Sequence, residues 1–274
     1  MPITLITGCS SGIGLALAHS LRAAGHDVWA TARQEADVAA LAAAGFNAHR
    51  LDVNVAQQCE ALALLLAAKG QGLDVLVNNA GYGGMGPLLD QTDAMLRRQF
   101  DTNVVSLVTV TRALFPLLRQ NRGRVVNIGS VSGVLVTPFA GAYCASKAAV
   151  HALSDALRME LAPFGVQVME VQPGAIATRF AHNASAQAEQ VIADGSAWWP
   201  MRDGIRARAR ASQNHPTPAA TVAARISRAL ARPVSPRVLR VGRGSLALPL
   251  LAALVPKRVM DWVLRRSFGL GSTL

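Results

Sequence analysis

The stretch Ile3–Gly14, ITLITGCSSGIG, indicates how this chain folds. It begins as a short β-branched run typical of a buried strand and continues, from Ile13, into residues of helical period. Between the two lies a Gly-x3-Gly-x-Gly turn. Small residues there let the backbone approach a pyrophosphate, and the start of the helix supplies free N–H groups and the positive end of its dipole. The unit therefore predicts a nucleotide site, although a glycine pattern alone also fits an ordinary tight turn.

Short β-branched runs alternate with Ala/Leu-rich stretches of helical period along most of the chain. This pattern predicts strands at 3–7, 27–31, 48–51, 74–77, 124–128, 166–171 and 237–241. It predicts helices at about 13–24, 35–44, 55–69, 93–119, 142–162 and 218–231. Runs such as 75–77 and 125–128 are apolar nearly throughout, as expected of strands covered on both faces. The alternation predicts an α/β fold: a single-domain, doubly wound parallel sheet with helices on both faces.

The end of the second predicted strand bears on the choice of cofactor. Folds that bind NAD(H) commonly place an acid there for the ribose 2′-hydroxyl, whereas a 2′-phosphate prefers arginine. This chain ends the strand with Arg33 and has no acid before Glu35. Arg33, with the hydroxyls of Ser10 or Ser11, could hold a 2′-phosphate through charge-assisted hydrogen bonds. The sequence therefore favours NADP(H), with NAD(H) less expected; the alternative for Arg33 is a solvated start to the next helix.

A tyrosine and a lysine four residues apart are the most informative pair. Tyr143 is one of two tyrosines, and Lys147 is one of only three lysines among 27 Lys and Arg side chains. Residues i and i+4 share a helix face, and a lysine ammonium, unlike arginine, is titratable and can lower the pKa of a neighbouring phenol. Ser130 lies thirteen residues upstream of Tyr143. Reduction of a carbonyl builds charge on its oxygen, which then needs a hydrogen-bond donor and a proton. Taken alone, Tyr143 could equally be a core tyrosine with a satisfied hydroxyl, and Ser130 could equally be a turn residue.

With these features and Asn78-Asn79-Ala80-Gly81 after the fourth strand, the chain from about residue 3 to 178 resembles the short-chain dehydrogenase/reductase family. The resemblance implies a Rossmann-like fold and a set of nucleotide contacts. Its cofactor-binding positions correspond to Gly8, Gly12, Ile13, Gly14, Asp52, Val53, Asn79, Ala80, Gly81, Pro173, Gly174, Ile176 and Thr178. Within that set, Asp52 matches the acid that contacts adenine, and Ile176 and Thr178 match the residues that hold the nicotinamide carboxamide.

The resemblance also implies catalytic roles. Tyr143 is the acid in reduction and the base in oxidation, and Ser130 orients the substrate oxygen. Lys147 favours the phenolate, bonds the nicotinamide ribose, and with Tyr143 counts among the cofactor contacts. Asn103 matches a fourth catalytic residue, which would anchor a water linking Lys147 to solvent; the alternative for Asn103 is an internal polar kink. His151 fits a structural histidine, and the adjacent Cys144 is given no role.

Two later segments bear on the substrate. By resemblance, residues 179–218 are a substrate lid within a catalytic domain over 1–242. Trp198 and Trp199 fit either an apolar pocket wall or packing against the body. A solvated helix face is expected for four arginines: Arg202, Arg206, Arg208 and Arg210. Residues 243–274 form an apolar and basic C-terminal extension, whose apolar run over 245–256 falls short of the roughly 20 residues that span a bilayer. We expect a lid over a lipophilic substrate with peripheral membrane contact; packing on another subunit is the alternative.

Charge is concentrated at one end of the chain. Residues 1–199 carry 13 Lys and Arg against 14 Asp and Glu, and residues 200–274 carry 14 against 2, so that −1 and +12 sum to +11. The nearly neutral body and the lack of a reading module argue against a nucleic-acid binder. The three cysteines and six histidines show no metal-like spacing, and no targeting peptide is recognised, so we expect a cytoplasmic protein, with membrane association as a variant. By resemblance, the long helices carrying Asn103 and Tyr143 form the faces of a homodimer or homotetramer.

The sequence thus predicts an NADP(H)-dependent oxidoreductase that transfers a hydride between the nicotinamide and a lipophilic carbonyl or alcohol. By resemblance, the expected class is a steroid-, retinoid- or fatty-type ketone or aldehyde. A ketoacyl-thioester reductase is one alternative. A non-catalytic nucleotide-sensing or scaffold protein of the same fold is another, against which the intact Ser130, Tyr143 and Lys147 set argues.

Overall fold

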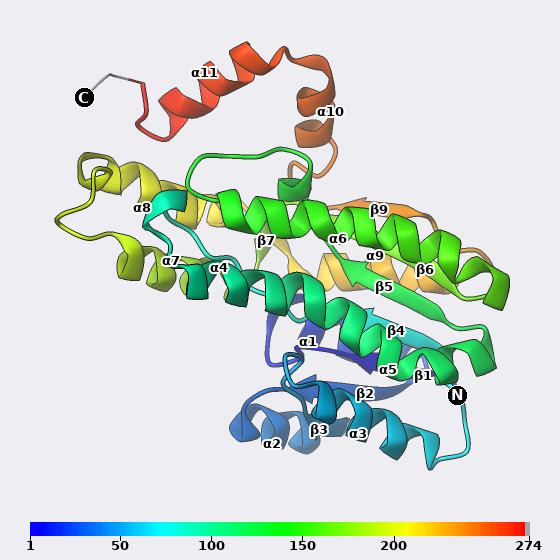
Figure 1. Ribbon diagram of the computed structural model, residues 1–274. Coiled ribbons are helices and arrows are strands. Elements are labelled where there is room, and N and C mark those ends of the chain that lie inside the picture. The colour runs from blue at the N-terminus through cyan, green and yellow to red at the C-terminus, as the bar shows by residue number, and fades with distance from the viewer. Residues whose placement is uncertain (272–274) are drawn as a thin grey trace.

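A seven-stranded parallel sheet forms the centre of the computed structural model, which describes residues 1–271 (Figure 1). Its strands are β1 (Ile3–Ile6), β2 (Asp27–Ala32), β3 (Asn47–Arg50), β4 (Val75–Asn78), β5 (Arg124–Ile128), β6 (Gln167–Pro173) and β9 (Val238–Val241). They lie in the order β3-β2-β1-β4-β5-β6-β9, so the winding reverses between β1 and β4. Ligands of such sheets bind at the carboxyl ends of the strands near this reversal. The doubly wound α/β fold predicted from the alternation is confirmed.

Helices cover both faces of the sheet. One face carries α1 (Gly12–Ala23), α2 (Glu35–Ala43) and α9 (Ala219–Leu230), and the other carries α3 (Ala56–Ala67), α5 (Ser106–Asn121) and α6 (Gly141–Glu160). Successive residues of a strand point to opposite faces of the sheet. Leu5 packs in the core with α3 and α5, and Ile6 packs in the core with α1 and α9. Because both faces of the central strands are buried, strands such as β4 and β5 carry apolar side chains at nearly every position, whereas the partly exposed edge strand β3 carries Asn, His and Arg.

The single helix predicted over 93–119 is wrong in one respect. α4 (Asp93–Phe100) is followed by a π-helical segment, Asp101–Val105, and α5 begins only at Ser106. A π turn holds one residue more than an α turn and is frequently found at functional sites. Within this segment the Asn103 side chain bonds the backbone of Tyr82. That contact joins residues far apart in the chain, so the hydrophobic period could not predict the interruption.

After β6 the chain passes through the segment 179–218, for which a substrate lid is predicted, returns to the sheet through α9 and β9, and continues into the C-terminal extension. The lid contains α7 (Phe180–Val191) and α8 (Arg202–Arg210), with a parallel pair, β7 (Ile176–Ala177) and β8 (Thr217–Pro218), at its base. A third apolar core joins both lid helices to α6. Single turns of 3-10 helix occur at Leu88–Asp90, Val131–Gly133, Ala162–Phe164, Trp199–Met201 and Ala211–Gln213.

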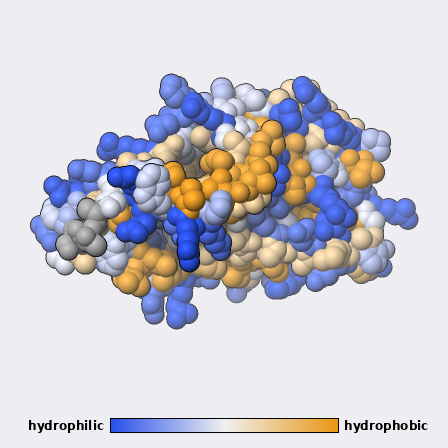
Figure 2. All heavy atoms as spheres, turned by 90° about the horizontal axis from the view of Figure 1, so that it is seen from above, coloured by the Kyte–Doolittle hydropathy of each residue, from blue (hydrophilic) through white to orange (hydrophobic). Residues whose placement is uncertain are grey.

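The extension folds into α10 (Ala247–Leu254) and α11 (Lys257–Ser267), at the top of Figure 1. It closes onto α8: a Cβ at Gly204 would lie only 2.0 Å from the Phe268 carbonyl oxygen, so this approach requires glycine. Seen from above, the extension presents a band of hydrophobic residues beside strongly hydrophilic ones (Figure 2). Leu250 and Trp262 are among its exposed apolar side chains. Within residues 1–271 no helix is both long enough and apolar enough to cross a membrane.

Candidate active site

The glycine turn between β1 and α1 forms a cradle that side chains would fill. Gly8 has a φ of +72°, and a Cβ there would lie 2.9 Å from the Cα of Ala80. A Cβ at Gly14 would lie 2.4 Å from the Gly8 carbonyl oxygen. Asn79, just after β4, ties the turn in place, because its Nδ2 donates to the carbonyl oxygens of Thr7 and Gly8 at 2.8 and 2.9 Å. The cradle leaves backbone and a helix N-terminus facing outward, which suits the pyrophosphate of a dinucleotide.

A cavity of about 890 Å³ runs from this cradle across the carboxyl ends of the strands. It collects most of the residues that the sequence singled out. Its walls include Gly8, Ser10, Ser11, Gly12, Ile13, Arg33, Asp52, Val53, Asn79, Ala80, Gly81, Ser130, Tyr143, Lys147, Pro173, Gly174, Ile176 and Thr178. Gly14 and Asn103 are not in its walls: Gly14 supports the cradle from behind, and Asn103 lies behind Gly81.

At the end of the cavity near β2, Arg33 is exposed and lines the wall with Ser10 and Ser11. Asp37 and Asp52 line the same cavity. The backbone N–H of Asn54 donates to the Asp52 carboxylate at 3.0 Å, which holds that side chain at the cavity edge. This end therefore offers both a cationic and an anionic group to a nucleotide.

Tyr143 and Ser130 are both buried, each with 7% of its surface exposed. Burial raises the pKa of the Tyr143 phenol to about 12, while a hydrogen bond with Ser130 and the positive charge of Arg208 act to lower it. The phenol therefore holds its proton at neutral pH. It can act as a proton donor to an oxygen that also meets Ser130.

Lys147 lies one helical turn after Tyr143 on α6, and its Nζ donates to the carbonyl oxygen of Ile128 at 2.7 Å. Burial lowers the pKa of this lysine from 10.5 to about 8, and the Glu170 carboxylate acts to raise it. The Arg208 guanidinium, expected from the sequence to lie in solvent, is a further cation that acts to lower the phenol pKa.

Asn103 uses its whole amide to hold other parts of the site. Its Nδ2 donates to the Tyr82 carbonyl oxygen at 2.9 Å and to the Ser146 hydroxyl at 3.0 Å. Its Oδ1 accepts from the Tyr82 backbone N–H at 3.0 Å. A Cβ at Gly81 would lie 3.1 Å from that oxygen and 3.8 Å from Lys147 Nζ, so the asparagine and the lysine approach the same glycine. Asn103 thus lies in an interruption of the α-helix and also close to Lys147.

A sequence profile described as short chain dehydrogenase matches residues 2–189 of this chain. The chain belongs to the short-chain dehydrogenases. Members of this family are oxidoreductases, and this chain is therefore an oxidoreductase of the family.

Several proteins resemble this short-chain dehydrogenase in sequence. The uncharacterized oxidoreductase YbbO of Escherichia coli is 40% identical over 183 residues, which cover 66% of this chain and 68% of that protein. Short-chain dehydrogenase/reductase GME11361 of Pestalotiopsis microspora is 33% identical over 269 residues, covering 97% and 93%. The 3-ketodihydrosphingosine reductase of Bacteroides thetaiotaomicron is 37% identical over 185 residues, covering 66% of each chain.

Solved structures resemble it over nearly the whole chain. A short-chain dehydrogenase from Streptomyces avermitilis superposes with a TM-score of 0.79 at 31% identity, covering 100% of this chain and 99% of that one. A serine dehydrogenase complexed with NADP+ has a TM-score of 0.75 at 28% identity (88% and 94% covered). A short-chain dehydrogenase/reductase from Burkholderia phymatum in complex with NAD has a TM-score of 0.76 at 26% identity, covering 96% of this chain and 95% of that one. Structural neighbours of this short-chain dehydrogenase thus bind either nicotinamide nucleotide.

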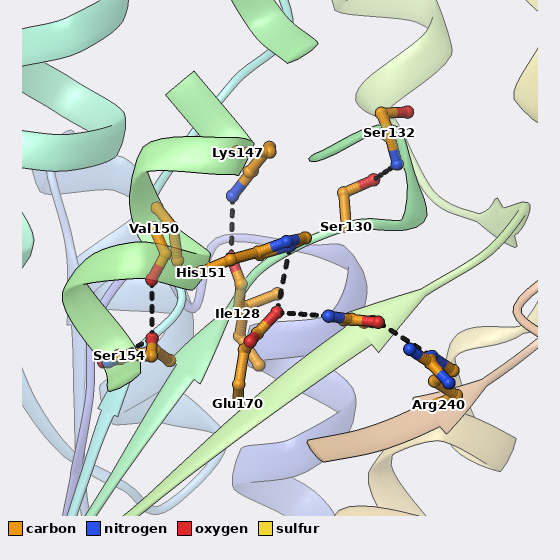
Figure 3. A network of polar contacts seen from close by, with 11 residues as sticks. Ile128, Ser130, Ser132, Lys147, Val150, His151, Ser154, Glu170 and Arg240 are labelled. Atoms are coloured by element: carbon orange, nitrogen blue, oxygen red, sulfur yellow. Dashed lines mark hydrogen bonds and ion pairs between the residues drawn. The ribbon is translucent and has the colours of Figure 1, made fainter. Parts of the chain in front are cut away.

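Below Lys147, a chain of polar groups runs from α6 through the buried Glu170 and Gln172 to the exposed Arg240 on β9 (Figure 3). His151 Nε2 lies 2.9 Å from Glu170 Oε1, to which Gln172 Nε2 also donates at 2.8 Å. Arg240 Nε then donates to Gln172 Oε1 at 2.9 Å. His151 thus lies beside the Glu170 carboxylate and is not among the residues that line the cavity. The motifs in the sequence do not point to Glu170, although an acid inside the strand run VQVMEVQP is a signal that identifies it.

The lid and the extension supply the walls around Tyr143. The Phe180 ring, at the start of α7, lies 5.3 Å from the Tyr143 ring between centroids. Leu248, Leu264 and Phe268 of the extension also line the cavity. The two tryptophans are not among the lining residues: Trp198 packs against the third core, and the Arg202 guanidinium lies 5.0 Å from the Trp199 ring. Of the two readings of Trp198 and Trp199, packing is the one that the structure supports.

The expectation of a solvated arginine face on α8 is wrong for one residue. Arg206 is partly exposed and pairs with Glu189 at 2.8 Å, as on an ordinary surface. Arg208 is only 8% exposed and lines the cavity. Its helix packs against α7 and α6 in the third core, which turns Arg208 inward. Among residues 1–271, no group of three or more His, Cys, Asp or Glu side chains is arranged to hold a metal ion.

Proposed function

We propose that this short-chain dehydrogenase interconverts an apolar ketone or aldehyde and its alcohol with NADP(H). The observation that carries the proposal is that Ser130, Tyr143 and Lys147 line one cavity with the glycine cradle. A cavity that joins a dinucleotide cradle to a buried proton donor suits hydride transfer coupled to proton transfer.

Each residue of the group has a task that its surroundings support. When bound, NADP(H) supplies or accepts the hydride. The Tyr143 phenol, protonated at neutral pH, donates its proton to the carbonyl oxygen on which charge develops. The Ser130 hydroxyl, bonded to the phenol, holds that oxygen beside it. Lys147 maintains a positive charge next to the reacting groups below its lowered pKa of about 8.

The preference for NADP(H) is supported by the exposed Arg33 beside Ser10 and Ser11. A guanidinium and hydroxyls are the groups that grip a 2′-phosphate, although Asp37 in the same wall would repel it. We expect Arg33→Asp to weaken NADPH binding by on the order of 10- to 100-fold, because charge-assisted hydrogen bonds are lost. Binding of NADPH and NADH, followed by nucleotide fluorescence, checks this. Arg225→Asp, on the exposed face of α9, is the control; equal affinity of the unaltered protein for both nucleotides would overturn the assignment.

The apolar character of the substrate is supported by the wall that Leu135, Phe180, Leu248, Leu264 and Phe268 form. A relative bears the name 3-ketodihydrosphingosine reductase and is thus named for a ketone with a long alkyl chain. The test is NADPH oxidation with ketones and aldehydes of increasing apolar bulk. Rates are expected to rise with bulk, and a preference for small polar carbonyls would contradict the proposal.

Tyr143→Phe tests the proton donor itself. Removal of a general acid costs roughly 10²- to 10⁴-fold in rate, so we expect turnover to fall by that amount. NADPH binding is expected to remain, because the cradle is formed by β1, α1 and β4. Unchanged turnover would remove Tyr143 from the mechanism.

The proposal extends to the whole protein. We propose a catalytic domain over 1–242, whose lid over 179–218 is completed by the extension over 243–274, and a homodimer or homotetramer formed through the faces of the helices that carry Asn103 and Tyr143. Val105 and Met159, both exposed, are apolar residues on those elements. Light scattering measures the mass in solution, and a monomer at all concentrations would contradict the assembly.

A further inference from the structure

Arg208 is a buried guanidinium without an acidic partner in the wall of the active-site cavity. It is 8% exposed and shares the cavity with Ser130 and Tyr143. Its Nε donates to the Thr137 hydroxyl at 2.5 Å, and the Cys144 thiol is a further polar group acting on it. None of the ion pairs within residues 1–271 includes Arg208.

A buried charge of this kind is unfavourable by itself. Removing a guanidinium from water is costly unless an anion or several hydrogen bonds compensate it, and a thiol is a weak acceptor. Burial accordingly lowers the pKa of Arg208. One hydroxyl on Nε leaves the Nη groups, the fork that binds a carboxylate in bidentate fashion, without a strong acceptor. Both acids that line the cavity, Asp37 and Asp52, lie at its nucleotide end.

We infer that Arg208 and Thr137 form a subsite for the carboxylate of the substrate. The inference rests on the proposed function and narrows it: the substrate is an oxo acid, or the matching hydroxy acid, that carries an apolar chain. The carboxylate would pair with Arg208, and the chain would lie against Leu264 and Phe268. In reduction, the carbonyl carbon gains the hydride from NADPH and the oxygen gains the Tyr143 proton. The C=O double bond becomes C–OH, and the carboxylate is unchanged.

Two other roles for Arg208 lead to different expectations. If it only ties α8 to the loop of Thr137, its loss would loosen the lid for every substrate alike. If it acts only by lowering the pKa of the Tyr143 phenol, its loss would change the rate with every carbonyl alike. A carboxylate subsite alone makes the effect depend on the charge of the substrate.

The test compares dodecanoic acids with the oxo group at successive positions with the methyl esters of the same acids. For each pair, kcat/KM for NADPH oxidation gives an acid-over-ester ratio. We expect at least one acid to be preferred, and Arg208→Gln to lower that ratio by on the order of 30- to 100-fold, because one partner of a buried charge pair is removed. Arg208→Lys retains the positive charge but loses the bidentate fork. Its acid-over-ester ratio is expected to lie between those of the unaltered protein and of Arg208→Gln. Arg210→Gln, exposed at the end of the same helix, is the charge-matched control and should leave the ratio unchanged.

Binding of dodecanoate and methyl dodecanoate by calorimetry, with NADP+ present, separates this inference from the proposed function. Arg208-dependent binding of the acid without turnover of any carbonyl would support the subsite and overturn the proposed function. Turnover with an acid-over-ester ratio that Arg208→Gln leaves unchanged would overturn the subsite alone. If Arg208→Gln does not fold, the acid-over-ester ratios of the unaltered protein and of Arg208→Lys still test the subsite. A preference of the unaltered protein for the ester in every pair would contradict the inference.

Discussion

At the residue scale, Lys147 shows how the interior of the protein changes the chemistry of a single side chain. Its ammonium is buried against the Ile128 carbonyl oxygen, and burial makes the charged form less favourable. The Glu170 carboxylate acts in the opposite direction from β6, with His151 packed beside it. The pKa of Lys147 is therefore lowered by burial and raised by Glu170, which lies on a different element of the fold.

This balance predicts the pH dependence of the reaction. Reduction that needs the Lys147 ammonium is present below the lysine pKa of about 8 and is lost as the pH rises through it. Glu170→Gln removes the charge that raises this pKa, so we expect the loss to begin at lower pH, by roughly one unit. The profile of kcat/KM against pH measures the change. Glu160→Gln, exposed at the end of α6, is the control, and an unmoved profile in Glu170→Gln would contradict the role of Glu170.

Residues could be predicted where the signal is local in the chain. Gly8, Gly12 and Gly14 lie on one turn, and Tyr143 and Lys147 on one helix face, so spacing alone placed them together. Glu170 and Arg208 could not be predicted in this way. Each acquires its role from groups on elements distant in sequence, and an arginine in an arginine-rich helix looks the same whether it faces solvent or a cavity.

At the scale of elements, the strands and body helices follow from their apolar periods, because each is covered by the layer that its pattern requires. The π segment at Asp101–Val105 does not follow from the apolar period; within it Asn103 bonds to Tyr82, which lies 21 residues earlier in the chain. The docking of α11 on α8 could not be predicted from the sequence either. It depends on the close approach of Gly204 to Phe268, which lies 64 residues later in the chain.

The docking of α11 on α8 can be tested by a substitution that adds a single methyl group at Gly204. Gly204→Ala places a Cβ where the Phe268 carbonyl oxygen lies, so we expect α11 to move away from α8 while the body keeps its stability. Hydrogen exchange of the amides in 257–268 should quicken by at least about tenfold, as the local opening energy falls. Gly195→Ala, a lid glycine with open space around it, is the control. Unchanged exchange would show that the contact does not hold the extension.

At the scale of the whole molecule, the face above the cavity combines apolar and basic groups (Figure 2). Leu250, Leu254 and Trp262 are 59%, 72% and 57% exposed, and α11 carries basic residues at both ends. An apolar helix face flanked by cations matches the surface of an anionic bilayer. We propose that this face rests on such a membrane near the entrance for apolar substrates.

Vesicle sedimentation tests this contact. The protein is expected to bind phosphatidylglycerol vesicles more tightly than phosphatidylcholine vesicles, and to be released by salt, because the basic groups add an electrostatic attraction. Leu250→Glu should reduce binding several-fold, whereas Leu64→Glu, at an exposed leucine of α3, should not. Equal loss in both variants, or no binding to either vesicle, would rule out the proposed face.

The order in which the cavity is assembled along the chain has an evolutionary consequence. The cradle and the Ser130, Tyr143 and Lys147 group all precede residue 179, and the family profile ends at residue 189. Phe180, Arg208 and Phe268, which face the reacting end, all come later in the chain. If the proposed function holds, we predict that recombination downstream of residue 178 exchanges the substrate selectivity, while the cradle and the Ser130, Tyr143 and Lys147 group are inherited together. A chimera that joins residues 1–178 to the later segment of a relative would transplant the substrate range of the donor.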